Sequence, residues 1–276
     1  MIAAGLALAV VSAVAIGGGY ALQHSTASRL PRLTLRRPLH SLASLLRSRR
    51  WAIGFFGGIA GWALYVEALR LAPLSLVQAA SAGGIGVLAF GGARLSRAER
   101  IGVGAALAGL MLLAVSVGSH PPTGRGNAVA VAIWMGASLA VAAALARFAP
   151  SAAGLGTAAG VLYAAGDVGT KAAVVGGGRL LFVPALLACH GLAFVCMQLA
   201  FQRGGRLASA GLAVLWTNAL PIAAGTALFA EALPGGVHGG LRIAAFALVL
   251  VGAVALSRRS AVPEAGSIGG SAFQYH

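Results

Sequence analysis

The sequence predicts an all-α polytopic membrane protein, and three observations lead to that fold class. Of the 276 residues, 59% are hydrophobic and only 9% are charged, whereas a soluble domain has about 25% charged residues. The apolar residues form continuous runs, close to the roughly 20 residues that a helix needs to cross a bilayer. A membrane β-barrel would instead alternate polar and apolar residues over segments of about 10. The runs therefore favour transmembrane helices.

Nine apolar runs are expected to form transmembrane helices. The first lacks the basic start of a signal peptide and is long enough to span, so we expect it to be retained. Turns rich in Pro and Gly separate several later runs, as at 119–126 and 233–236. The expected spans are 2–22, 51–71, 74–93, 101–117, 127–146, 152–173, 180–202, 207–230 and 239–257.

Arginine sets the expected orientation. The net charge is +15, and all basic residues except Lys171 are arginines, most of them in short connections. Placing the arginine-rich loop 29–50 in the cytoplasm puts most of the others on the same side, as the positive-inside rule requires. The N-terminus then lies outside a cytoplasmic membrane and the C-terminus inside. This distribution reflects topology, and we expect no nucleic-acid partner.

The loop 29–50 contains a segment, 31–50, that is long enough to span but has Arg36, Arg37 and Pro38 near its middle. Each arginine at mid-bilayer costs roughly 2.5 to 3.5 kcal/mol on insertion scales. We therefore expect the segment to be cytoplasmic or to form an amphipathic helix at the membrane surface.

The chain divides into two related halves. Residues 1–118 form the first transmembrane half with the loop 29–50, 119–126 connect the halves, 127–259 form the second, and 260–276 are expected to be a disordered tail. The stretches that begin at Glu67 and Leu199 share an order of features: a helix end, a short turn, a small-residue span, and a last span with a late glycine. Such duplication is typical of transporters built from inverted repeats.

Short motifs resemble the drug/metabolite transporter superfamily (EamA-like). The stretch ALRLAPLSLVQ at 68–78 is similar to its link between the third and fourth helices, and FAEALPGG at 229–236 is similar to the close of its ninth helix. LAPLSLVQ and GGGYALQHSTAS at 17–28 also resemble the NIPA-like magnesium-transporter branch, which is usually drawn with nine helices. The arginine-rich segment stands where the family's second span is usual, and Arg94 replaces an expected acidic residue. If 127–146 were the counterpart of the first span, the two would run in the same direction.

Asp167 and Lys171 are the leading candidate site, because both lie in an otherwise apolar segment. Residues four apart share a helix face, so the two groups can neutralise each other. One interpretation is a self-contained ion pair. The other is a site for substrate or proton coupling, since ionisable groups inside a membrane usually line a functional path. Gly166 and Gly169 would loosen this helix, as in the broken helices of transporter sites.

Glu67 is the third candidate for substrate or proton coupling, and the alternative is an ion pair with Arg70. Thr217 and Asn218 place polar groups at mid-span, and Gln78 and Gln198 do the same in their spans. Hydrogen bonding between helices is the alternative role for these groups. Glu231 is expected to have a structural role at a helix end. The expected pocket wall consists of Trp62, Tyr65, Tyr163, Trp216, Asn218 and Gln78.

These features predict a secondary transporter that moves a small or lipid-linked solute by alternating access. A NIPA-like magnesium permease is the first alternative, because Mg²⁺ needs only one or two carboxylates. Asp167 and Glu67 could supply them, although Lys171 and Arg70 argue against a cation path. A non-transporting scaffold or assembly subunit is the second alternative, and a homodimer is compatible with the small-residue faces. No nucleophile and base set is evident, so we expect no enzyme and no cofactor. The histidines have no metal-ligand spacing: His24, His40, His120, His190, His238 and His276.

Overall fold

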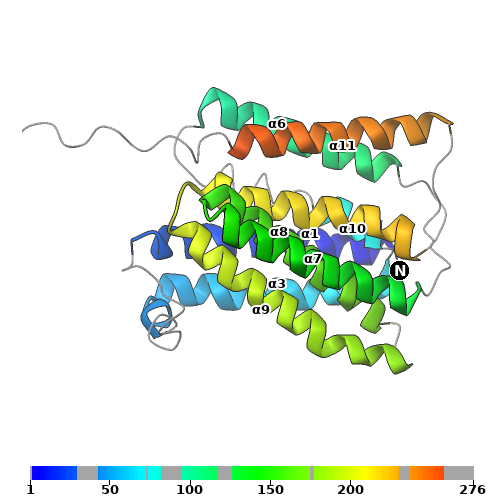
Figure 1. Ribbon diagram of the computed structural model, residues 1–276, viewed down its shortest axis with the longest axis horizontal. Coiled ribbons are helices and arrows are strands. Elements are labelled where there is room, and N and C mark those ends of the chain that lie inside the picture. Colours follow the sequence, from blue (N-terminus) through cyan, green and yellow to red (C-terminus); the bar gives the residue numbers. More distant parts are fainter. Residues whose placement is uncertain are drawn as a thin grey trace, which may run out of the picture.

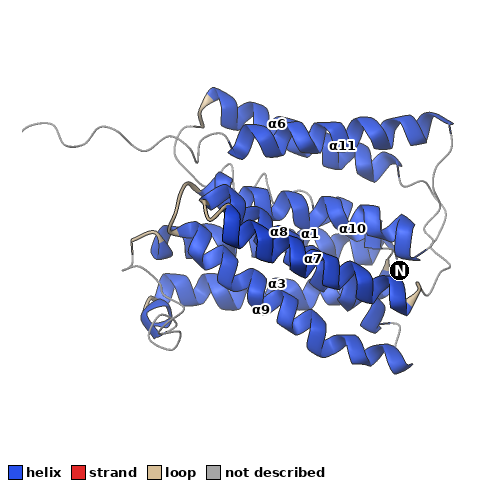
Figure 2. Cartoon of the chain, in the orientation of Figure 1, coloured by secondary structure: helices blue, strands red, loops and turns tan. Residues whose placement is uncertain are grey.

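A computed structural model of the chain is helical throughout the residues that it describes, and it contains no strand within them (Figure 2). The described residues are 2–29, 43–72, 74–81, 95–116, 126–174, 177–229 and 236–257. The helices are α1 (Ile2–Ala27), α3 (Arg49–Leu71), α4 (Leu74–Ser81), α6 (Arg97–Ser116), α7 (Ala128–Phe148), α8 (Ala152–Val174), the 3-10 helix η1 (Gly177–Leu181), α9 (Phe182–Phe201), the π-helix η2 (Leu207–Gly211), α10 (Leu212–Phe229) and α11 (Gly236–Ser257).

The predicted all-α class is confirmed for the described residues, and each expected span coincides at least partly with a helix. Within the described ranges, five helices are long and apolar enough to cross a membrane: Ala3–Ala27, Arg49–Leu71, Ala128–Phe148, Gly178–Phe201 and Leu207–Phe229. Several predictions concern residues outside the described ranges. They are most of the arginine-rich segment (30–42), the second part of the third span (82–93), most of the connecting loop (119–125), Glu231 and the tail (260–276).

The exterior of the bundle is apolar, and several polar side chains lie inside it. Ile133 on α7 is 66% exposed and Leu181 in η1 is 84% exposed, whereas Asp167 on α8 is only 6% exposed. Soluble proteins bury charged groups rarely and seldom expose such large apolar surfaces. The structure therefore has the polarity of a membrane protein, in which lipid covers the apolar exterior.

Helix α8 forms the centre of the bundle, between α7, α9 and α10 (Figure 1). Most of its residues are buried, and many are Gly or Ala, so neighbouring backbones can approach closely. A Cβ atom at Gly160 would lie 2.7 Å from the carbonyl oxygen of Ala213 on α10, and one at Gly156 would lie 2.5 Å from that of Ser209 in η2. Because its neighbours cover it, α8 can carry polar residues that a lipid-facing helix could not.

Two further helix pairs flank this centre. Helix α1 packs along α3, where Gly19 and Gly54 face each other's backbone. Helix α6 packs along α11, and Figure 1 shows these two helices together at one side of the bundle. Gly109 lies against Val249 on α11, and Gly252 lies against Ala106 on α6. The late glycines of the two related stretches therefore serve the same helix contact.

One end of the bundle carries most of the described arginines. His24 Nε2 lies 3.2 Å from the Gly204 carbonyl oxygen, which brings the end of α1 to the turn between α9 and η2. Leu256 near the end of α11 packs against both Gly102 on α6 and Gly211 in η2, so these elements share that end. The arginines here are Arg29, Arg47, Arg49, Arg50, Arg97, Arg100, Arg147, Arg203 and Arg206.

The contact between α1 and α3 gives a prediction about stability. Gly54→Ala would place a Cβ 2.7 Å from the Gly19 carbonyl oxygen, whereas a Cβ at Gly57 on the same helix meets no atom within 4 Å. Overpacking costs about 1 to 3 kcal/mol, and Gly to Ala in an open helical position gains up to about 1 kcal/mol. We expect Gly54→Ala to lower the free energy of unfolding, measured by SDS titration in mixed micelles, and Gly57→Ala to leave it equal or raise it. Equal effects of the two substitutions would contradict this packing.

Candidate functional site

A cavity of about 490 Å³ lies between α1, α3, α4, α8, α9 and α10. This volume is within the roughly 300 to 1,000 Å³ of sites for small organic molecules. Among the described lining residues the only carboxylate is that of Asp167, and no Lys or Arg is present. The aromatic lining residues are Tyr20, Phe55, Trp62, Tyr65, Tyr163 and Phe194, and the other polar ones are Ser12, Gln23, Gln78, Ser81, His190, Thr217 and Asn218.

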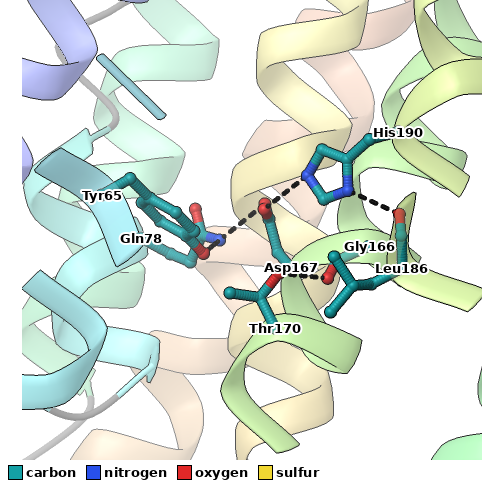
Figure 3. Close-up of polar contacts among 7 residues, drawn as sticks. All are labelled: Tyr65, Gln78, Gly166, Asp167, Thr170, Leu186 and His190. Atoms are coloured by element: carbon teal, nitrogen blue, oxygen red, sulfur yellow. Dashed lines mark hydrogen bonds and ion pairs between the residues drawn. The ribbon is translucent and has the colours of Figure 1, made fainter. Parts of the chain in front are cut away.

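Asp167 receives polar partners from three other helices (Figure 3). Its Oδ2 atom accepts a hydrogen bond from Gln78 Nε2 on α4 at 3.1 Å, and the same amide nitrogen lies 2.5 Å from the Tyr65 hydroxyl oxygen on α3. Its Oδ1 atom lies 3.6 Å from His190 Nε2 on α9. Burying a carboxylate is tolerable only when such partners surround it, so Asp167 links α3, α4, α8 and α9.

His190 is held in one orientation. Its Nδ1 atom lies 2.8 Å from the carbonyl oxygen of Leu186, one turn earlier on α9, so its Nε2 atom faces Asp167. Gly166 makes this possible, because a Cβ at that position would collide with the imidazole ring. His190 was not among the site residues predicted from the sequence. The signal that could have identified it was an ionisable side chain inside the apolar span 180–202.

Lys171 stabilises the end of a different helix. Its Nζ atom donates to the carbonyl oxygens of Leu69 at 2.8 Å and Ala72 at 3.2 Å, at the C-terminus of α3. The last carbonyls of a helix lack intrahelical donors and carry partial negative charge, so a cation is favourable there. Asp167 and Lys171 share α8 as predicted, but their described hydrogen bonds lead to different neighbours.

The predicted site residues fall into two groups. Asp167, Trp62, Tyr65, Tyr163, Asn218 and Gln78 line the cavity, whereas Lys171, Glu67 and Trp216 are not among its described lining residues.

Glu67 is not among the described lining residues of the cavity, and it lies beside Arg70. Glu67 Oε2 lies 3.3 Å from Arg70 Nη1, and the two side chains are 52% and 61% exposed. This is the ion-pair alternative of the sequence analysis. Within the described residues, no group of three or more His, Cys, Asp or Glu side chains could hold a metal ion.

Several buried polar atoms around the cavity lack a hydrogen-bond partner in the part of the chain that the structure describes. Asn218 donates through Nδ2 to the Val214 carbonyl at 2.7 Å, which leaves its Oδ1 as an unpaired acceptor. Buried polar groups are nearly always paired, and leaving one unpaired costs about 1 to 3 kcal/mol. A concentration of such atoms in one cavity points to a ligand-binding site. The unpaired atoms of lining residues are Ser12 Oγ, Trp62 Nε1, Ser81 Oγ, His190 Nε2, Thr217 Oγ1 and Asn218 Oδ1.

A second buried polar cluster lies toward the arginine-rich end. Trp51 Nε1 on α3 donates to Gln198 Oε1 on α9 at 3.1 Å, and Gln198 Nε2 donates to Gln23 Oε1 on α1 at 2.7 Å. Gln23 also lines the cavity. The expected role of Gln198 in hydrogen bonding between helices is therefore confirmed.

Comparison of the chain with protein-family models, curated proteins and solved structures finds no match. The resemblance of its short motifs to the drug/metabolite transporters stays a prediction. What is known about the site is its geometry: a cavity inside an apolar bundle, with one buried acid and a set of unpaired polar atoms.

The position of Lys171 predicts a structural effect. Lys171→Met removes two hydrogen bonds from a charged donor, each worth about 1.5 to 3 kcal/mol. We expect the free energy of unfolding of Lys171→Met, measured by SDS titration, to lie below that of the unchanged protein by about 1.5 kcal/mol or more. Arg70→Met, near the same end of α3, removes only an exposed ion pair and should change stability by about 1 kcal/mol or less. An equally small effect of Lys171→Met would show that the lysine does not stabilise the end of α3.

Proposed function

We propose that the protein is a secondary transporter that moves a small organic solute across the membrane by alternating access. The cavity carries this proposal, because it places a buried acid and unpaired polar atoms inside an apolar bundle. Ionisable groups at such places usually line a path for substrate or ions. The volume suits one small organic molecule.

The helix contacts support an inverted repeat of four helices. Helix α1 packs along α3 as α8 packs along α9, α4 contacts α10, and α6 packs along α11. We pair α1, α3, α4 and α6 with α8, α9, α10 and α11, and α7 has no counterpart. In a chain of nine spans, α1 and α8 run in opposite directions, as inverted repeats require. If α7 were the counterpart of α1, the two helices would run in the same direction, which an inverted repeat does not allow. Pairing α1 with α8 avoids this conflict.

The two buried polar clusters fit the requirements of alternating access. The Trp51, Gln198 and Gln23 cluster and the Tyr65, Gln78 and Asp167 cluster each join helices from both proposed repeats. We place one cluster toward each side of the membrane, as gates that open in turn. The arginine-rich end would face the cytoplasm by the positive-inside rule, so the N-terminus would lie outside.

The alternatives receive less support. A magnesium permease using Asp167 and Glu67 would need both carboxylates on the path, and Glu67 is an exposed partner of Arg70. A scaffold without transport would leave the polar lining of the cavity without an assigned role.

Alternating access can be tested before the solute is known. We expect Thr217→Cys, with Cys189 and Cys196 replaced by Ser, to react with a membrane-impermeant maleimide from both sides of the membrane, because Thr217 lines the cavity. Ile133→Cys in the same background should stay unreactive, because that exposed position on α7 would face lipid.

Reaction of Thr217→Cys from one side only, or from neither, would contradict alternating access. Slower reaction in the presence of Mg²⁺, without an effect of organic solutes, would favour the magnesium permease.

A further inference from the structure

Given the transport function proposed above, we propose further that the cavity binds a primary amine with an apolar body, in exchange for one proton held between Asp167 and His190. The inference starts from the orientation of the imidazole. A carbonyl oxygen can only accept, so His190 Nδ1, which lies 2.8 Å from the Leu186 carbonyl, must carry a hydrogen. In a neutral ring Nε2 is then an acceptor, and it faces Asp167 Oδ1, another acceptor.

A contact between two facing acceptors is favourable only if one of them carries a proton or a donor lies between them. The atoms are 3.6 Å apart, which is beyond a normal hydrogen bond. One proton on either group makes the pair electrically neutral, as a carboxylic acid beside imidazole or as a carboxylate beside imidazolium. Loss of that proton would leave the pair itself with a net negative charge, which is costly to bury. The described hydrogen bonds of Lys171, the cation one turn away, lead to the carbonyl oxygens of Leu69 and Ala72. Asp167 and His190 therefore form a one-proton pair.

A primary ammonium group can replace this proton. It restores neutrality and has three N–H donors, so it can bond Oδ1 and Nε2 together at about 2.8 Å each. Binding it while the pair keeps its proton would bury a net positive charge, so exchange is favoured over joint binding. A quaternary ammonium has the charge but no N–H donor, and an alcohol has only one donor and no charge.

The surroundings of the pair suit the rest of such a molecule. The Trp62 and Tyr163 rings lie 5.5 Å and 5.7 Å from the His190 ring, centroid to centroid, and offer aromatic surface to an apolar body and to the cation. Asn218 Oδ1 provides a further unpaired acceptor on the cavity wall.

The titratable and charged groups around the pair do not supply a second acid. Tyrosines approach from three helices, Lys171 is one turn away on α8, and the neighbouring groups on α4 and α10 are the uncharged amides Gln78 and Asn218. The tyrosines are Tyr20 on α1, Tyr65 on α3 and Tyr163 on α8.

The test uses the full-length protein in detergent and three probes of one shape: 2-phenylethylamine, its N,N,N-trimethyl derivative and 2-phenylethanol. Calorimetric titration should give a Kd for the amine about tenfold or more below the values for the other two, as loss of a charged hydrogen bond predicts. Titration in buffers of different ionisation enthalpy should count one proton released per amine. The Kd should therefore fall as the pH rises, by up to about tenfold per pH unit, as long as the pair still holds its proton.

Equal affinity for the amine and its trimethyl derivative, or binding without proton release, would overturn the proposal. Asp167→Asn should lose the preference for the amine while still binding 2-phenylethanol, which also shows that the variant is folded. His190→Gln should bind the amine more weakly, because the Nε2 acceptor is lost, while Asp167 can still release its proton. If neither variant folds, the three probes on the unchanged protein still decide.

The binding test can fail while the labelling test succeeds, and the reverse, so the two outcomes can be told apart. Labelling of Thr217→Cys from both sides without amine binding would leave transport standing and remove this substrate class. Amine binding with labelling from one side only would retain the site and remove alternating access.

Discussion

The buried carboxylate of Asp167 is the constraint on which the centre of the bundle depends. An apolar bundle cannot hold a carboxylate unless neighbouring helices supply hydrogen bonds or charge. Gln78 and His190 approach this group from α4 and α9, and Tyr65 joins Gln78 from α3. Four helices separated in sequence therefore meet at one side chain, and the cavity lies beside it.

The small residues of α8 make this convergence possible. Gly156 and Gly160 admit η2 and α10 to close contact, and Gly166 leaves room for the imidazole of His190. Lys171 fixes the same helix against the end of α3 through two backbone carbonyls. The packing that shields α8 from lipid thus also positions the groups that line the cavity.

Local features of the sequence were enough to predict the helices, but not their partners. Long apolar runs predicted the spans because a helix satisfies its backbone within one segment, whatever surrounds it. Asp167, Tyr65 and Gln78 were identified because polar groups stand out in such runs. The contact of Lys171 with Leu69 could not be predicted, because it joins residues about a hundred positions apart. The contact of His190 with Asp167 could not be predicted, because it depends on the space that Gly166 leaves on another helix. The ion pair of Glu67 with Arg70 could be given as an alternative from the sequence alone, because residues three apart share a helix face.

The central claim is that Asp167 and His190 act as one unit around a single proton. The most direct measurement is ¹⁵N NMR of histidine-labelled protein in lipid bilayers, with the His190 ring signals assigned by their loss in His190→Gln. The geometry predicts that Nδ1 of this ring always carries a hydrogen. Nε2 either carries the proton of the pair or faces a protonated Asp167. A neutral ring protonated at Nε2 and bare at Nδ1 would contradict the account, because Nε2 would then supply a donor to Asp167 and the pair would need no shared proton.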